Sequence, residues 1–289
     1  MNWVEIDKDT CYMCGICVTI CPRCFSKSGN GIFASADEDT CNLCGHCVSL
    51  CPQDAIIHNK MNMDNFIPVK STISFETSDF MKFVRERRSH RHFQDKDIPR
   101  ADLERLIDIC RYAPTGSNIQ TVEILVIQNQ KRMKALSDLA VDFFRDMLDS
   151  VERDVEHLQS EGKEVPGDLL LIHSMAEYRK RLVIARDSGL DPIFHQAPAV
   201  IIFHSPALTS TPKDNCVIAA HTMALTARTM GLESCYIGLF EGAFWGSHAI
   251  RDNLNLPDGH NVYSVLILGY PLFKFRTVID RKEIMTRWE

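Results

Sequence analysis

Apolar residues recur with two different periods along the larger, C-terminal part of the chain. Three segments alternate apolar and polar positions and are rich in branched side chains, which predicts β-strands over residues 121–128, 199–204 and 262–268. Helical spacing of apolar residues fills the intervals, at residues 131–158, 168–187, 215–230 and 247–254. Many helices around few strands predict an α+β domain with a central sheet flanked by helices.

Two further helix signals lie ahead of the first strand. Asp79 is a suitable N-cap for a helix that ends near residue 88, and Pro99 suits the first turn of a second helix, which Pro114 ends. Residues 57–79 show no steady helical or strand period, so we expect a linker there. The predicted organisation is a small domain over residues 1–60, a linker over residues 61–78 and a larger domain over residues 79–289.

Length and charge narrow the classes of protein. A chain of 289 residues can hold this small domain and one larger domain with a proper core. The formal net charge of -6 does not favour nucleic acid, and the longest apolar runs, residues 199–203 and 265–268, are too short to cross a bilayer. The first residues lack the apolar core of a signal peptide. We therefore expect a soluble, cytoplasmic protein with no nucleic-acid or membrane partner.

Eight of the 12 cysteines form two ladders with identical spacing, and a proline follows each ladder. The first ladder is Cys11, Cys14, Cys17 and Cys21, and the second ladder is Cys41, Cys44, Cys47 and Cys51. This spacing matches bacterial ferredoxins with two [4Fe-4S] clusters, in which the fourth cysteine of each run binds the other cluster. We expect cluster one on Cys11, Cys14, Cys17 and Cys51, and cluster two on Cys41, Cys44, Cys47 and Cys21.

Structural zinc sites and a disulfide framework are two other roles that cysteines can have. Structural zinc sites usually separate their two CxxC pairs by a dozen or more residues, and a disulfide framework needs an oxidising compartment. Neither condition is met. A domain of this size buries little core, so we expect the clusters to hold it together.

A chain that carries clusters needs an acceptor for single electrons, whereas most organic substrates accept pairs. A flavin accepts and donates electrons singly or in pairs, so a flavin site is expected in the larger, C-terminal domain. The most basic stretch, RERRSHR at residues 85–91, offers guanidinium groups that suit a phosphate, although a solvated helix end would look the same. Lys274 and Arg276 lie two apart and would face the same side of an extended chain, unless they belong to an ordinary polar tail.

Two loops add weaker candidates. The segment APTGSNIQ, residues 113–120, offers short polar groups that could bind a heteroaromatic edge, but most such loops are only turns. The glycines of residues 231–246 would let backbone amides approach a ligand closely. The chain contains neither GxGxxG nor a Walker A motif, so nucleotide-binding loops of those kinds are set aside.

Taken in order, these segments resemble the FMN-dependent nitroreductase family over residues 80–279. The matching pieces are RRSHRHF, APTGSNIQ, DPIFHQAPAVIIF, GLESCYIG and LGYP. With the cysteine ladders in front, the whole chain resembles the ferredoxin-fused branch of that family. The resemblance implies a nitroreductase-like FMN domain that forms an intertwined homodimer, with two flavins at the interface.

The resemblance also implies which residues bind FMN. Residues expected at the phosphate and ribityl chain are Arg87, Arg88, Ser89, Arg91, Lys274 and Arg276. Residues expected to reach the flavin from the partner subunit are Pro114, Thr115, Gly116, Ser117 and Asn118. Backbone groups expected along the isoalloxazine edge belong to Tyr236, Ile237, Gly238 and Leu239.

The predicted function is therefore an iron-sulfur flavoprotein oxidoreductase that passes electrons from two [4Fe-4S] clusters to FMN and on to a nitroaromatic or similar small electrophile. The electron donor would be reduced ferredoxin or NAD(P)H. No residue is singled out as a catalytic acid or base. The alternative is an electron-transfer or redox-sensing protein that acts on a protein partner, with Cys24, Cys110, Cys216 and Cys235 as candidate redox thiols.

Overall fold

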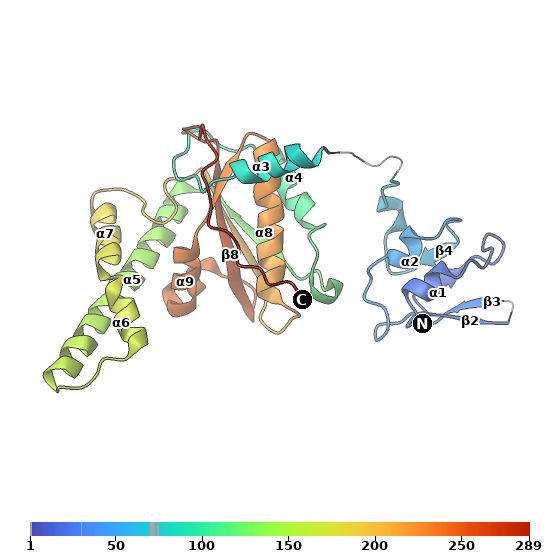
Figure 1. The fold of residues 1–289 in the computed structure, drawn as a ribbon, viewed down its shortest axis with the longest axis horizontal. Coiled ribbons are helices and arrows are strands. Elements are labelled where there is room, and N and C mark those ends of the chain that lie inside the picture. The colour runs from blue at the N-terminus through green and yellow to red at the C-terminus, as the bar shows by residue number, and fades with distance from the viewer. Residues whose placement is uncertain (1, 30, 70–72, 74) are drawn as a thin grey trace. The chain divides into compact units, whose positions relative to one another are not determined.

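The computed structural model describes residues 2–29, 31–69, 73 and 75–289, which form two compact units (Figure 1). One unit comprises Met1–Phe75 with Gly116–Ile119, and the other comprises Glu76–Thr115 with Gln120–Glu289. Within the predicted linker, residues 70–72 and 74 lie outside the described residues. Each unit is described by itself below.

The N-terminal unit is built from two similar halves, each with one short helix. Strand β1 (Val4–Ile6) pairs antiparallel with β4 (Ile56–His58), and β2 (Phe25–Ser28) pairs antiparallel with β3 (Gly31–Ala34). Helices α1 (Ile16–Ile20) and α2 (His46–Ser49) follow glycines with positive φ, 81° at Gly15 and 70° at Gly45, a conformation that favours glycine. A short 3-10 helix, η1 (Met63–Asn65), ends the unit's regular structure.

The duplication seen in the sequence is repeated in the hydrogen bonds before each ladder. The Thr10 hydroxyl donates to the Asp7 carboxylate at 2.5 Å, and the Thr40 hydroxyl donates to the Asp37 carboxylate at 2.7 Å. The N-terminal core is small. Its fully buried members are Val4, Cys17, Cys24, Phe25, Ala36, Val48 and Ile56. A core of this size supports the expectation that bound clusters stabilise the unit.

The C-terminal unit has a four-stranded antiparallel sheet in the order β5-β6-β8-β7. Its strands are β5 (Glu123–Ile127), β6 (Ala199–Pro206), β7 (Glu233–Tyr236) and β8 (His260–Gly269). Both faces of the central strand β6 are buried, because side chains alternate along it. Val200 and Ile202 enter one core, whereas Ala199, Ile201 and Phe203 enter the other.

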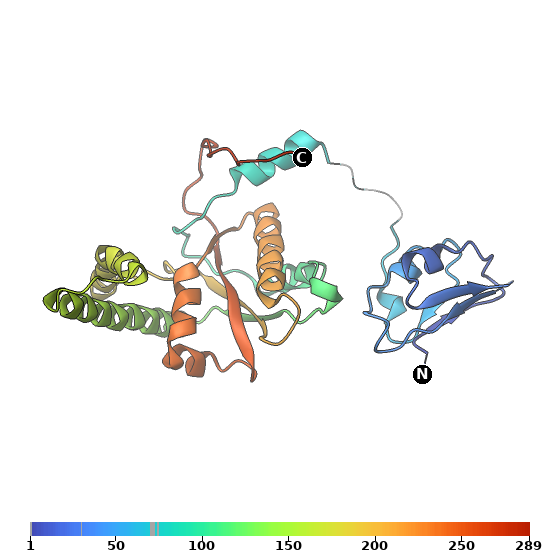
Figure 2. The same ribbon diagram turned by 60° about the horizontal axis from the view of Figure 1, so that its bottom comes forward.

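Helices cover both faces of this sheet (Figure 2). One face packs against α4 (Arg100–Cys110) and α8 (Pro212–Thr229), and the other packs against α5 (Gln130–Ser160), α9 (Gly238–Gly246) and α10 (His248–Leu254). The C-terminal half of α5 extends beyond the sheet with α6 (Gly167–Ser174) and α7 (Ala176–Asp187) packed along it (Figure 1). Helix α3 (Thr77–Glu86) precedes α4 and has no fully buried residue.

The α+β prediction is confirmed, and the three predicted strands correspond to β5, β6 and β8. Three details differ. Helix α3 begins at Thr77 rather than after Asp79. The predicted helix over residues 168–187 is two helices that meet at Met175, where the Ser174 hydroxyl donates to the Leu171 carbonyl at 2.7 Å and competes with the helical backbone bonds. The sequence analysis also missed β7 and α9, which lie in the glycine-rich segment.

Candidate functional site

The N-terminal unit brings the thiols together in two groups. Burial raises the pKa of Cys47 to about 11, and the neighbouring charges that add to this rise are those of Cys21, Cys41 and Cys44. Cys21 comes from the first ladder, so this group joins three cysteines of one ladder with the fourth cysteine of the other. It has the composition predicted for cluster two.

The other thiols also lie close together. Burial raises the pKa of Cys17, with smaller contributions from Cys14 and Cys11. The pKa of Tyr12 is raised by burial first and then by Cys14 and Cys51. The assignment of Cys51 to cluster one stays a prediction.

His58 gives the second thiol group a hydrogen bond that the first group lacks in the equivalent position. Its ring is 2% exposed, and its Nε2 lies 3.4 Å from the Cys41 sulfur. The Nδ1 atom accepts the Lys60 backbone N–H at 3.3 Å, which leaves Nε2 to carry the proton and donate it to the sulfur. Burial lowers the pKa of His58 and keeps the ring neutral. Thirty residues earlier, the repeat has an exposed serine, Ser28.

The cysteines outside the ladders have the properties of packing residues. Burial raises the pKa of Cys24, Cys110 and Cys216 to about 12, so their thiols stay protonated near neutral pH. The Cys24 thiol donates to the Thr40 carbonyl at 3.4 Å. A protonated thiol is a poor nucleophile, which argues against these three as redox sensors.

In the C-terminal unit, the arginine segment and the segment after β8 run side by side. The Gln94 N–H donates to the Tyr270 carbonyl at 2.9 Å, and the Leu272 N–H donates to the His92 carbonyl at 3.0 Å. Past this short ladder, the Arg88 guanidinium lies 5.2 Å from the centre of the Phe275 ring. Two segments that are 180 residues apart in sequence thus bring the predicted phosphate ligands together.

The end of β7 joins the same region. The His90 N–H donates to the Ser234 carbonyl at 3.0 Å, which fixes the arginine segment against the edge strand. Burial raises the pKa of Tyr236 to about 12, and the nearby charge of Arg87 opposes this rise. Lys274 and Arg276 line a cavity of about 290 Å³ with His90 and Glu233. Arg87 and Arg88 line a second cavity of about 660 Å³, and both cavities share Val278.

A buried ion pair forms one wall of the smaller cavity, and the sequence analysis missed it. The Arg228 Nε lies 3.0 Å from the Glu233 carboxylate, and Nε2 of His90 lies 3.7 Å from the other carboxylate oxygen. His90 is 6% exposed, although it belongs to the most basic stretch of the chain. Glu233 lies in the segment GLESCYIG, but nothing in the sequence indicates its partner Arg228, which is at the end of α8.

The backbone at residues 236–239 forms the start of α9. The Ile237 N–H donates to the Val265 carbonyl at 2.9 Å, and its own carbonyl accepts from Glu241 at 3.3 Å. Gly238 and Leu239 are the first two residues of α9, and N–H groups in a helical first turn have no acceptor within the helix. These two amides are therefore better suited than that of Ile237 to donate to a ligand.

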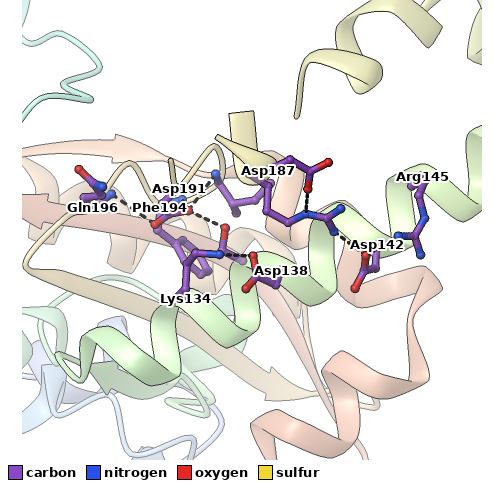
Figure 3. Close-up of polar contacts among 11 residues, drawn as sticks. Lys134, Asp138, Asp142, Arg145, Asp187, Asp191, Phe194 and Gln196 are labelled. Carbon is purple, nitrogen blue, oxygen red and sulfur yellow. Dashed lines mark hydrogen bonds and ion pairs between the residues drawn. The ribbon is translucent and has the colours of Figure 1, made fainter. Parts of the chain in front are cut away.

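Arg91 faces a different cavity from Arg87 and Arg88. It lines a space of about 600 Å³ with His195 and Gln196. The loop that carries these two residues is fixed by Asp191, whose carboxylate accepts from Ser137 Oγ at 2.5 Å and from the Phe194 N–H at 2.9 Å (Figure 3). Burial lowers the pKa of His195, and the charge of Arg91 lowers it further.

Pro114 and Thr115, at the start of the predicted loop, lie away from this region. They precede β5, at one edge of the sheet, whereas β7 is the opposite edge. Three strand spacings of about 4.8 Å place the two edges about 14 Å apart. Thr115 lines a separate cavity of about 250 Å³ with residues of α4 such as Ile107 and Cys110. Within the C-terminal unit, these two residues therefore lie apart from the residues around β7.

Comparison with known proteins identifies the family of this chain. The sequence model of the Nitroreductase family matches residues 84–270, about two thirds of the chain. The chain belongs to the nitroreductase family. A 4Fe-4S binding domain is matched in addition at residues 34–57, which include all four cysteines of the second ladder. This nitroreductase is thus of the ferredoxin-fused kind, as the resemblance predicted.

Related proteins carry reductase names. A 4-nitrobenzoate reductase from Pseudomonas putida is 30% identical over 67% of this chain and 86% of its own length. Another 4-nitrobenzoate reductase, from Nocardioides sp., is 25% identical over 66% of this chain and 80% of its own length. Both alignments leave about a third of this nitroreductase unmatched.

Solved structures share the fold. A nitroreductase with bound FMN from Bacteroides fragilis has a TM-score of 0.53 at 22% identity and covers 73% of this chain and 100% of its own. A BluB-like flavoprotein from Clostridium difficile has a TM-score of 0.55 at 15% identity and covers 72% of this chain and 96% of its own. Within the described part of this nitroreductase, no helix is both long enough and apolar enough to span a membrane.

Proposed function

We propose that this nitroreductase passes electrons from two [4Fe-4S] clusters to FMN and then to a nitroaromatic or similar small electrophile. As a ferredoxin-fused member of its family, the chain is an FMN-dependent oxidoreductase with an iron-sulfur domain. The observation that carries the proposal is the convergence of Arg87, Arg88, Lys274 and Arg276 on two cavities that share Val278, in a chain that also holds two cysteine ladders. Residues 1–60 would form the cluster domain, 61–78 the linker and 79–289 the flavin domain.

The cationic side chains fit the phosphate of FMN. Arg87 and Arg88 come from the chain after α3, and Lys274 and Arg276 come from the chain after β8, so four positive groups from two segments surround adjoining cavities. Guanidinium forks bind phosphate oxygens in pairs, and Ser89 adds a neutral donor. In this proposal Arg91 contacts the ribityl side rather than the phosphate, because it lines a different cavity.

The ring would lie at the start of α9. Gly238 and Leu239 offer backbone N–H groups at a helix N-terminus, where the helix dipole favours electron-rich atoms. FMN supplies the exchange between single electrons and electron pairs. The chain positions the cofactor and leaves one side of it open to a small acceptor. Solvent supplies the protons, since no buried acid is assigned to this task.

We propose that the functional unit is a homodimer in which the partner supplies its residues 114–118. Two observations support this. Pro114 and Thr115 precede β5, and β5 and β7 are opposite edges of the sheet, about 14 Å apart by strand spacing. Apolar side chains of α3 and of the C-terminal segment are also uncovered in one chain, among them Phe80 at 53%, Ile284 at 88% and Trp288 at 90% exposure.

The fusion bears on the electron donor. An attached pair of clusters would be redundant if NAD(P)H alone reduced FMN directly. We therefore propose that reduced ferredoxin or another low-potential protein donates electrons to the clusters. The alternative role, a redox sensor without a small-molecule acceptor, is less favoured because burial raises the pKa of Cys24, Cys110 and Cys216 to about 12 and so disfavours the reactive thiolate.

Anaerobic purification followed by metal and flavin analysis tests the proposal. Eight irons and one FMN per chain, together with reduction of nitrobenzoate or a quinone by the reduced protein, are the expected results. Four irons per chain would remove the two-cluster claim. A fully reduced protein that no nitroaromatic or quinone reoxidises would remove the proposed acceptor class.

A further inference from the structure

A group of three polar side chains lies at one end of the sheet and plays no part in the proposed electron path. Glu123 on β5 is the register partner of His204 on β6, and His260 is the first residue of β8. Among the described residues, these three alone bring one donor atom each from His, Cys, Asp or Glu side chains within 4.8 Å of one another.

The three side chains share a face because β8 contains an irregularity. Val265 and Ile267 enter the core below α5, so strict alternation would turn His260 to the opposite face. The register shifts between Phe203 and His204, where Ser264 and then Val262 are the successive partners. Such a bulge places an extra residue in one strand and re-aims the side chains beyond it. His260 thereby comes to the face that carries His204.

The two imidazoles are close and largely shielded from water. Nδ1 of His204 lies 3.0 Å from Nδ1 of His260. His204 is 4% exposed, and the side chain of His260 is 8% exposed. Glu123 lies at the outer side of the pair, with its carboxylate 3.9 Å from Nε2 of His260 and its side chain 54% exposed. The charged partner can therefore change rotamer without disturbing the core.

The spacing of the two Nδ1 atoms is close to that of imidazole ligands on one ion, and the exposed Glu123 side chain completes the set by turning toward this pair. Two imidazole nitrogens bound to a tetrahedral metal at about 2.0–2.1 Å lie about 3.3 Å apart. Only neutral imidazole ligates, and burial favours the neutral form of His204, whose pKa it lowers. Two imidazoles and a carboxylate suit zinc and ferrous iron, whereas the thiolates of the ladders suit clusters.

We propose that Glu123, His204 and His260 form a binding site for one divalent transition-metal ion, separate from both cysteine groups. Each ligand comes from a different strand, so the ion ties β5, β6 and β8 together at this end of the sheet. Three protein ligands leave a fourth position for water or another small ligand. The competing arrangement is a neutral histidine pair that shares one hydrogen bond and holds no metal.

Zinc binding by the complete holoprotein tests the site. The protein, with its iron and flavin in place, is dialysed anaerobically against Zn²⁺, and zinc and iron are both counted by mass spectrometry. The expected result is one zinc per chain with unchanged iron. The His204→Gln and His260→Gln variants should lose this zinc, whereas His248→Gln, at an exposed position of α10, should keep it.

The zinc and iron contents also distinguish the results that would oppose the proposal. No stoichiometric zinc in the wild type would leave the neutral histidine pair as the correct account. Zinc taken up equally by His260→Gln, or only as iron is lost, would assign it to other groups such as the ladder thiols. Because the histidine variants sit in the sheet, Glu123→Gln provides a milder check. Zinc should raise the melting temperature of the wild type and leave that of Glu123→Gln unchanged, and equal shifts in both would overturn the proposal.

Discussion

The hydrogen bond from His58 to Cys41 gives a prediction about the redox potential of one cluster. Reduction adds negative charge to a cluster, so a donor aimed at one of its sulfurs stabilises the reduced form more than the oxidised form. The His58→Leu substitution removes the Nε2–H donor and keeps a buried side chain of similar bulk. We expect the potential of cluster two to fall.

The magnitude follows from the burial and geometry of this bond. His58 is 2% exposed and its Nε2 lies 3.4 Å from the sulfur, so water neither screens the bond nor replaces it after mutation. A hydrogen bond to a charged group contributes about 1.5–3 kcal/mol, and roughly half of that is expected as the difference between the two redox states. For a one-electron couple, about 1.4 kcal/mol equals 59 mV, so the expected fall is about 30–65 mV.

An anaerobic redox titration followed by electron paramagnetic resonance measures both clusters in one sample. Cluster one provides an internal reference, because its ligands make no contact with His58. The His46→Leu variant is the matched control, since His46 adjoins Cys47 but is exposed. The reasoning would be refuted if both potentials in His58→Leu equalled those of His46→Leu, or if the affected potential rose.

Four other results are expected. Arg88→Ala and Lys274→Ala should each weaken FMN retention while iron content stays at the wild-type value, and a loss of iron instead would mean that these residues support folding. A Cβ on Gly269 would lie 2.5 Å from Phe93 and 2.7 Å from Pro198. Gly269→Ala should therefore lower the unfolding free energy of the flavin domain by about 1–3 kcal/mol in a denaturant titration, and an unchanged midpoint would contradict this packing. Iron chelation should melt the N-terminal unit before the flavin domain in calorimetry, whereas a single unchanged transition would show that the small core suffices. The melting temperature should fall as the pH drops below about 6.5. Burial lowers the folded-state pKa of several histidines, so the unfolded chain binds more protons than the folded chain in this pH range. A melting temperature that is flat or rises from pH 7 to 5 would oppose this. These histidines are His58, His90, His195 and His204.

The features that the sequence predicted best are those with a local physical signature. Thiolate spacing alone predicted the iron-sulfur domain, because a cubane fixes where its ligands stand along a short chain. Strands β5, β6 and β8 were predicted because each alternates or is continuously apolar over at least five residues.

The features that the sequence did not predict depend on long-range pairing. Strand β7 has four residues, ESCY, and its strand character comes from pairing with β8 rather than from its own pattern. Helix α9 contains three glycines and tolerates them because Phe240 and Phe244 anchor it in the core. The Arg228–Glu233 pair and the burial of His90 both depend on β7. Because the sequence did not predict this strand, it did not predict these two features either.

The glycine-rich segment illustrates the same limit at the candidate site. Its glycines pointed to close approach of backbone amides, and the structure gives that idea a specific form in the first turn of α9. Sequence spacing could not separate Ile237, whose amide pairs with Val265, from Gly238 and Leu239. The register of the sheet decides which backbone amide pairs with a neighbouring strand and which is left to donate to a ligand.

The central claim is that electrons reach FMN through the clusters. Anaerobic stopped-flow mixing of the holoprotein with reduced ferredoxin tests it, using the wild type beside Cys14→Ser and Cys44→Ser, each altered at one exposed ladder cysteine. The account predicts that flavin absorbance bleaches at the turnover rate in the wild type and far more slowly in both variants, with FMN still bound. Bleaching at the wild-type rate in either variant would show that electrons bypass that cluster and would contradict the claim.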